Sequence, residues 1–192
     1  GCKGNGKIDA LGSIGVYFAP TYNGETTLFG EQKIGEMLSS YAQMYDPKLK
    51  KRVDQNVIMK HTNQRAEMTA VLRALERILE LGPAAQQISK VVMITDSQQY
   101  VLSWIGKGRL WKEYVTDKTF KDIPNRDLIA LLCRYVWMWA RLLKPDCTFA
   151  ESKTLLLDSG YWSVIWVEAH QDEDKVKFAK LGGLDLEIGR AH

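Results

Sequence analysis

Two carboxylates stand where a side chain could contact a bound ligand. Asp96 directly follows the apolar run VVMIT, which predicts a strand buried on both faces. In open α/β sheets, ligands bind at the carboxyl ends of the strands, so this position favours ligand binding by an anionic oxygen. The alternative is that Asp96 only caps the next helix. Glu67 lies in the first turn of a predicted helix beginning near Thr62, where the helix dipole alone could account for an acidic residue.

The segments around these carboxylates alternate between helical and extended patterns. Apolar periodicity predicts helices over residues 63–81, 97–105 and 126–143, with a weaker helical pattern over 172–181. Short β-branched and apolar runs predict strands over residues 12–19, 88–95 and 163–169. Within residues 32–60, helical spacing is shared by Ile34, Met37, Leu38 and Tyr41, and Asp46-Pro47 interrupts it. This alternation predicts an α/β domain around a mixed sheet.

Composition limits the class of protein. A chain of 192 residues that is 45% hydrophobic and 26% charged suits one globular domain, here residues 1–192. No apolar run approaches the roughly 20 residues that cross a bilayer, which argues against a membrane protein. The net charge of +3 does not by itself indicate nucleic-acid binding. Three cysteines without a Cys-x-x-Cys pair argue against disulfides or zinc and favour an intracellular location, with the organelle left open.

Five short motifs resemble those of the ribonuclease H family (type 1, cellular form), and they occur in the family's order. They are Gly1-Cys2-Lys3-Gly4-Asn5-Gly6, Thr62-Asn63-Gln64-Arg65-Ala66-Glu67, Ile94-Thr95-Asp96-Ser97, Asn125-Arg126-Asp127-Leu128 and Trp166-Val167-Glu168-Ala169-His170. The resemblance spans nearly the whole chain. It implies a ribonuclease H-like fold, with a mixed five-stranded sheet and helices on both faces. It also implies an endonuclease that hydrolyses the RNA strand of RNA–DNA hybrids.

The resemblance further implies four carboxylates that hold two Mg²⁺ ions, with Mn²⁺ as an alternative. Two hard cations can activate a water and stabilise the leaving oxygen, and Mg²⁺ prefers oxygen ligands. Glu67 and Asp96 would be catalytic metal ligands. The first carboxylate of the set would lie two residues before Gly1, so the resemblance implies a domain that is truncated at its N-terminal strand. Val176 stands where the fourth is expected, so Asp174 is the nearest substitute, with Asp172 as an alternative. His170 would assist proton transfer or product release, unless it is an ordinary surface residue.

Substrate contacts are implied in the same way. The residues expected to contact the hybrid are Cys2, Asn5, Asn63, Gln64, Ser97 and Asn125. Amide side chains can reach base edges or 2′-hydroxyls in the wide minor groove, and hydroxyls such as those of Ser97 and Thr62 can donate to phosphates. Two basic segments could add phosphate contacts: residues 48–52, and residues 104–112, whose tryptophans could instead be core.

Two other functions remain open at this stage. A non-catalytic hybrid-binding module would arise if the carboxylate set had decayed. Another nuclease or an integrase on the same fold would share the carboxylates, but the Asn63-Gln64-Arg65 and Asn125-Arg126 motifs disfavour it. We expect the protein to act as a monomer.

Overall fold

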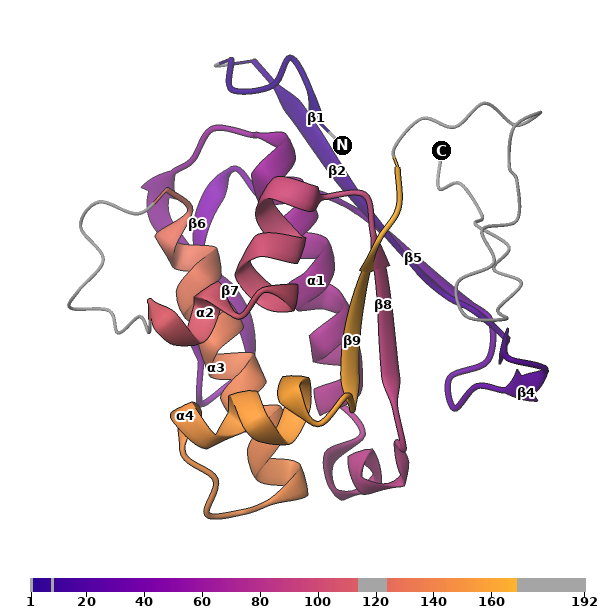
Figure 1. Cartoon of the computed structure of the whole chain (residues 1–192). Helices are drawn as coiled ribbons and strands as arrows, with labels where there is room; N and C mark the ends of the chain where they lie inside the picture. The colour runs from indigo at the N-terminus through magenta and orange to yellow at the C-terminus, as the bar shows by residue number, and fades with distance from the viewer. Residues whose placement is uncertain (1, 8, 114–123, 169–192) are drawn as a thin grey trace.

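The computed structural model describes residues 2–7, 9–113 and 124–168 of the chain (Figure 1). The strands are β1 (Cys2–Lys3), β2 (Leu11–Phe18), β3 (Thr21–Tyr22), β4 (Glu25–Thr26), β5 (Gln32–Met37), β6 (Tyr41–Asp46), β7 (Lys51–Ile58), β8 (Val91–Thr95) and β9 (Trp162–Trp166). The α-helices are α1 (Asn63–Leu79), α2 (Arg109–Lys112), α3 (Arg126–Leu143) and α4 (Phe149–Ser152). A 3₁₀ helix, η1 (Gly82–Gln87), and two π-helices, η2 (Gln98–Gly106) and η3 (Lys153–Asp158), complete the set. The predicted α/β class is confirmed.

An antiparallel sheet carries the N-terminal end of the chain. β2 pairs with β1 on one edge, from Cys2 opposite Gly12, and with β5 on the other, from Ser13 opposite Met37. α1 packs against β2, and Ile14, Leu38 and Ala66 form a small buried cluster between them. The predicted strand over residues 12–19 is therefore confirmed, shifted by one residue at each end.

The helical pattern over residues 32–41 was misleading, because this region forms strands. β5 alternates half-buried and exposed residues, and the Met37 side chain points outward at 64% exposure. Burial here repeats every two residues, as in a strand, although the same apolar residues also fit the repeat of 3.6 residues of a helix. Asp46 ends β6 and accepts hydrogen bonds from the backbone of Lys48 and Leu49, which makes the turn into β7.

The two later strands form a parallel pair. β8 and β9 are in register from Val91 opposite Trp162 to Thr95 opposite Trp166. Within the described residues the strands make four hydrogen-bonded groups where one five-stranded sheet was expected. β1, the edge strand beside β2, is two residues long, and no ladder joins this sheet to β8 in the described part of the chain. β8 is accordingly half-exposed where burial on both faces was predicted, with Ile94 39% exposed.

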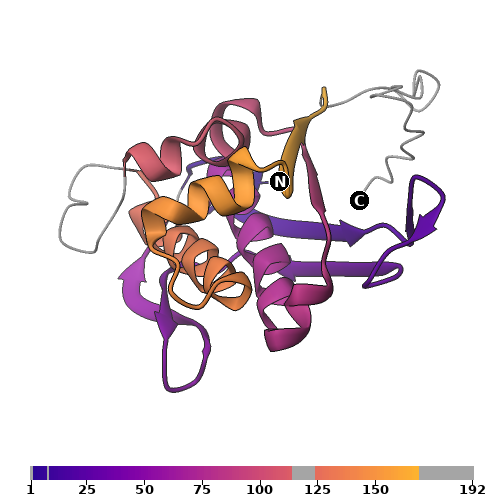
Figure 2. The same ribbon diagram turned by 60° about the horizontal axis from the view of Figure 1, so that its bottom comes forward.

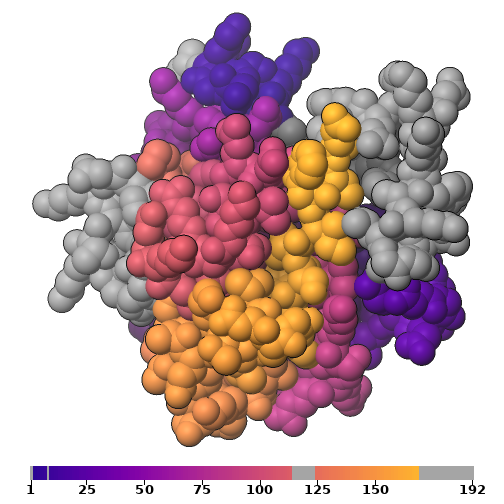
Figure 3. Space-filling model, viewed as in Figure 1, coloured from indigo at the N-terminus to yellow at the C-terminus, as the bar shows by residue number. Residues whose placement is uncertain are grey.

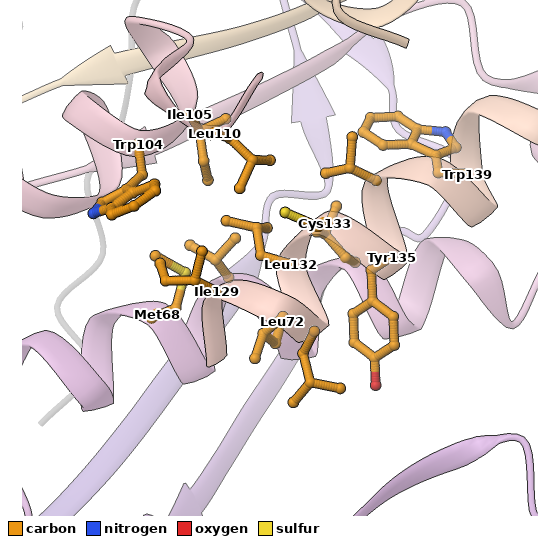
Figure 4. Packing of buried hydrophobic residues seen from close by; sticks show 14 of the residues in the cluster. Met68, Leu72, Trp104, Ile105, Leu110, Ile129, Leu132, Cys133, Tyr135 and Trp139 are labelled. Atoms are coloured by element: carbon orange, nitrogen blue, oxygen red, sulfur yellow. The ribbon is translucent and has the colours of Figure 1, made fainter. Parts of the chain in front are cut away.

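The main core lies between α1, α3 and η2. Figure 4 shows side chains of α1 (Met68, Leu72), of η2 (Trp104, Ile105) and of α3 (Leu132, Trp139) converging, all 0–1% exposed. The apolar stripes read from the sequence are thus the packing faces of α1 and α3. Truncating one of these leucines to alanine would cost about 2–5 kcal/mol.

α1 and α3 lie between the β6–β7 pair and the β8–β9 pair (Figure 2). In the space-filling view, η2 and α2 lie beside β9, with α4 and η3 next to them (Figure 3). The helix predicted over residues 172–181, a candidate for the other face, lies outside the described residues. None of the described helices is long and apolar enough to cross a membrane.

Candidate active site

Glu67 and Asp96 meet where α1 begins and β8 ends. Ser97, the neighbour of Asp96, donates a hydrogen bond from its hydroxyl to Glu67 Oε2 at 2.5 Å. Asp96 is exposed and directly follows β8, and Glu67 is partly buried on α1. The structure therefore brings together the two carboxylates that the sequence singled out, from segments about 30 residues apart.

The structural alternatives offered for these acids do not hold. Ser97, not Asp96, is the N-cap of η2, because its hydroxyl accepts a hydrogen bond from the Val101 amide at 3.1 Å. α1 begins at Asn63 with Thr62 as its N-cap, so Glu67 is the fifth helical residue and lies beyond the first turn. The stabilisation of an anion by the helix dipole fades within that turn. Helix capping therefore does not explain Asp96, and the helix dipole does not explain Glu67.

The surroundings of Glu67 favour its neutral form. Burial raises the pKa of the Glu67 carboxyl, and the nearby charge of Asp96 raises it further, while the hydrogen bond from Ser97 works in the opposite direction. Desolvation and a like charge both disfavour the carboxylate. A cation beside the two groups would compensate for both effects.

The carboxylate oxygens of Glu67 and Asp96 suit a hard divalent cation, but they are only two of the expected ligands. Carboxylate oxygens are what Mg²⁺ or Mn²⁺ prefers, and Glu67 and Asp96 are close enough for their charges to interact. However, no group of three or more potential metal ligands occurs in the part of the chain that the structure describes. Asp174 and His170, also predicted for the site, lie outside the described residues.

A first group of substrate candidates surrounds the start of α1. The Asn63 side-chain oxygen accepts a hydrogen bond from the Cys2 amide at 2.9 Å, and the Asn63 amide donates to Asn5 Oδ1 at 3.0 Å. Cys2 lies in β1 and Asn5 in the turn that follows, which is closed by a 2.8 Å bond from Lys7 N to Gly4 O. Three residues predicted to contact the hybrid are thereby assembled on one surface.

A second group joins the N-termini of α1 and α3. The side-chain amide of Asn125 donates to Gln64 Oε1 at 3.4 Å and to the Tyr100 hydroxyl at 3.1 Å. Asn125 precedes α3 with a φ of 58°, a left-handed conformation that asparagine tolerates better than most residues. Ser97, the sixth candidate, is 5% exposed and bonded to Glu67 and Val101, so the structure adds a structural role to its predicted one.

Sequence reasoning missed three residues that support this surface. Arg65 forms a buried, doubly hydrogen-bonded ion pair with Asp127, although both stand inside motifs that the sequence drew attention to. Tyr100 links Asn125 to the Pro124 carbonyl. The positions of Arg65 and Asp127 inside the motifs could have revealed them. A charged residue that stands beside predicted contact residues is a candidate for holding those contact residues in place.

Some residues of the two basic segments pack into the fold, whereas Lys48, Lys50 and Lys51 are exposed. Trp104 is 1% exposed, with the Arg109 guanidinium 4.2 Å above its ring, and Trp111 donates to Ser152 Oγ at 2.8 Å. These tryptophans therefore belong to the fold, as the sequence left open. In the other segment, Arg52 binds Glu76 at 2.8 Å, nine residues and about 13 Å along α1 from Glu67.

The α/β class and the paired carboxylates are features expected of a domain of the ribonuclease H type. Comparison with known families agrees, because the RNase H family matches residues 29–140, more than half of the chain. The chain therefore belongs to the RNase H family, whose members hydrolyse the RNA strand of RNA–DNA hybrids. The matched region contains Glu67, Asp96 and Asn125. No curated protein and no solved structure matched the chain.

Proposed function

We propose that this protein is a ribonuclease H that cleaves the RNA strand of RNA–DNA hybrids internally, through two divalent metal ions held by carboxylates. The observation that carries the proposal is the meeting of Glu67 and Asp96 at the end of β8. Both stand in the motifs of the family to which the chain belongs. Asp174 is the proposed further ligand, and His170 the proposed group for proton transfer or product release.

Each acid has a distinct part in this scheme. When bound, Mg²⁺ would activate a water and stabilise the leaving 3′-oxygen of the RNA strand. Asp96 is exposed and available as an oxygen ligand, whereas Glu67 is held in place by the Ser97 hydroxyl. The ligating form of Glu67 is its carboxylate, and its pKa is raised, so metal binding should strengthen as the pH rises through that raised pKa.

The amide side chains would recognise the hybrid. Asn63 and Asn5 flank the start of α1, and Gln64 and Asn125 face each other across the N-termini of α1 and α3. Amides both donate and accept, so they can bind base edges and 2′-hydroxyls in the minor groove. Cys2 would add a contact from β1. This arrangement supports selection of an RNA strand rather than a fully DNA duplex.

The direct test is cleavage of an end-labelled RNA–DNA hybrid in Mg²⁺. Because the family resemblance places a carboxylate two residues before Gly1, three proteins are compared: the chain itself, the chain preceded by Asp-Gly, and the chain preceded by Asn-Gly. We expect internal cuts in the RNA strand with the Asp-Gly chain and strongly reduced cleavage with the Asn-Gly chain. Absence of cleavage in all three, with hybrid binding intact, would contradict the proposal.

A second candidate is a hybrid-binding module without catalysis. It is favoured by one observation, that the described residues supply two clustered carboxylates and no group of three. This function predicts a hybrid affinity that exceeds the DNA-duplex affinity in all three proteins, with no cleavage in any of them. The same experiment therefore separates the two functions.

Assembly state and location are further proposals. We propose that the protein binds the hybrid as a monomer, which light scattering of the complex would test. We also propose an intracellular location, from the three cysteines and their spacing. Microscopy of the tagged protein would test the location and identify the compartment.

A further inference from the structure

A buried ion pair joins the residues next to the amides of Gln64 and Asn125. Arg65 Nη1 donates to Asp127 Oδ1 and Arg65 Nη2 to Asp127 Oδ2, both at 2.8 Å. The two side chains are 2% and 7% exposed. A buried ion pair contributes little net stability compared with well-packed apolar residues of similar volume. A contribution to folding stability therefore does not account for the Arg65–Asp127 pair. The hypothesis to test is that the pair fixes the positions of the neighbouring side chains.

The same guanidinium also sets the orientation of the Asn125 side chain. Arg65 Nη1 lies 3.4 Å from Asn125 Oδ1, so a donor faces the amide oxygen. The Asn125 NH₂ group is thereby turned toward Gln64 Oε1 and the Tyr100 hydroxyl. Rotating the amide by half a turn would place two donors against each other at Arg65. Asn125 is thus held in one of its two amide orientations.

Asp127 extends this arrangement to a third element. Its Oδ2 accepts a hydrogen bond from the Gln43 backbone amide of β6 at 2.9 Å. The Arg65 hydrogen bonds and charge outweigh burial and lower the pKa of the Asp127 carboxyl, so the pair stays charged at neutral pH. The pair therefore connects α1, the start of α3 and β6, although its members are 62 residues apart in sequence.

We propose that Arg65 and Asp127 are positioning residues that preset the Gln64 and Asn125 amides for reading the 2′-hydroxyls of the RNA strand. This inference rests on the proposed function, since it assumes that these amides face the hybrid. The planar, doubly bonded geometry fixes both distance and angle between the two helix N-termini. Amides ordered before binding avoid the entropy cost of ordering on the substrate.

The test compares two double variants of the whole chain. Arg65→Met with Asp127→Leu replaces the pair by apolar side chains, and Arg52→Met with Glu76→Leu removes a comparable ion pair toward the far end of α1. Dissociation constants for an RNA–DNA hybrid and for a DNA duplex of the same sequence are measured in EDTA, where metal-dependent cleavage cannot occur. Arg65→Lys, which keeps the charge but not the planar fork, is the milder third variant.

We expect the preference for hybrid over DNA duplex to fall about tenfold in the Arg65/Asp127 variant, as for the loss of one or two hydrogen bonds. It should fall less in Arg65→Lys and stay at the parent value in the Arg52/Glu76 variant. A general loss of stability would weaken both complexes alike and leave this ratio unchanged. A ratio unchanged in folded Arg65/Asp127 and Arg65→Lys variants overturns the proposal.

A second readout does not depend on nucleic acid. Nuclear magnetic resonance of the side-chain amides should show distinct, ordered Asn125 NH₂ signals in the parent protein and in the Arg52/Glu76 variant. In the Arg65/Asp127 variant and in Arg65→Lys they should move toward the values of a free amide. Unmoved signals overturn the positioning role. If the parent shows no preference for the hybrid but the signals move, the proposed function and the reading of 2′-hydroxyls are overturned, while the orientation by Arg65 stands.

Discussion

The Ser97 hydroxyl lies 2.5 Å from Glu67 Oε2 and donates a hydrogen bond to it, one residue after Asp96. Ser97 Oγ also accepts a hydrogen bond from the Val101 backbone amide. Ser97 therefore both caps η2 and holds the Glu67 carboxylate. Its own amide donates to Thr95 Oγ1 at 3.1 Å, which fixes the turn after β8. The loop that presents Asp96 is therefore tied to the helix that presents Glu67.

Replacing Ser97 by alanine should affect both stability and metal binding. Loss of the cap and of a part-buried hydrogen bond should lower the free energy of unfolding by about 1–2 kcal/mol. Because the lost bond favours the carboxylate, the pKa of Glu67 should rise further and Mg²⁺ should bind more weakly at neutral pH. Urea unfolding and calorimetric Mg²⁺ titration measure the two effects. Ser97→Thr retains the hydroxyl as a control, and equal Mg²⁺ affinity in Ser97→Ala and the parent would contradict this role.

Glu67→Gln should abolish cleavage while stabilising the metal-free protein at neutral pH. Burial and Asp96 raise the pKa of Glu67, so the folded state binds its proton more tightly than the unfolded state does. Stability of the parent therefore falls as the pH rises from the ordinary glutamate pKa to the raised one, and it stays reduced above that window. Glutamine carries no charge and avoids this loss, and its carbonyl can still accept from Ser97.

The measurement for Glu67→Gln is the thermal midpoint as a function of pH without metal. The variant should match or exceed the parent above the window, and its advantage should shrink below it. Glu31→Gln, at an exposed glutamate, is the matched control and should change neither stability nor cleavage. A loss of stability in Glu67→Gln that is greatest at neutral pH would show that the carboxylate is favoured there, contrary to this prediction.

Asp96→Asn should abolish cleavage with little change in stability. The residue is exposed, so the free energy of unfolding should change by no more than about 0.5 kcal/mol. Loss of the like charge should lower the pKa of Glu67 toward its ordinary value. Mg²⁺ that raises the thermal midpoint of the parent should raise it less in the variant, because a ligand is lost. Retained cleavage would remove Asp96 from the metal site.

Local signals predicted the elements that present the site. α3 runs over Arg126–Leu143 as expected, because its amphipathic stripe is long and Pro145 follows it. Asp96 was found from the rule that ligands bind at the carboxyl ends of strands. The region of β5 was misread because Ile34, Met37 and Leu38 fit a helix as well as a strand, and only pairing with β2 decides between them.

Long-range pairing was the part that the sequence could not supply. The partners Arg65 and Asp127 are 62 residues apart, and nothing local indicates that two charged residues are buried together. The error over Glu67 has a smaller cause: with about 3.6 residues per turn, the fifth residue of a helix that begins at Asn63 already lies in the second turn. Helix type was equally hidden, since η2 is a π-helix within an ordinary helical pattern.

Glu76→Gln should destabilise the fold without entering the chemistry. Glu76 Oε1 accepts hydrogen bonds from Arg52 and from the Tyr135 hydroxyl, each at 2.8 Å, and Oε2 accepts from Arg73 at 3.1 Å. Although burial alone would raise it, the pKa of the Glu76 carboxyl is lowered by the Arg52 hydrogen bond and charge, and by Tyr135 and Arg73. Removing one partner of a largely buried pair costs about 3 kcal/mol.

The pH dependence gives this prediction its sign. Because the folded-state pKa of Glu76 is lowered, the stability it contributes is fully present above the ordinary glutamate pKa and is lost as the pH falls through the lowered one. Denaturant unfolding should therefore show the largest difference between parent and Glu76→Gln at neutral pH and a small one in acid. Tyr135→Phe, which removes one hydrogen bond and no charge, should cost about 1 kcal/mol with little pH dependence. A Glu76→Gln protein as stable as the parent at neutral pH would show that this network adds nothing to the packing of α1 against α3.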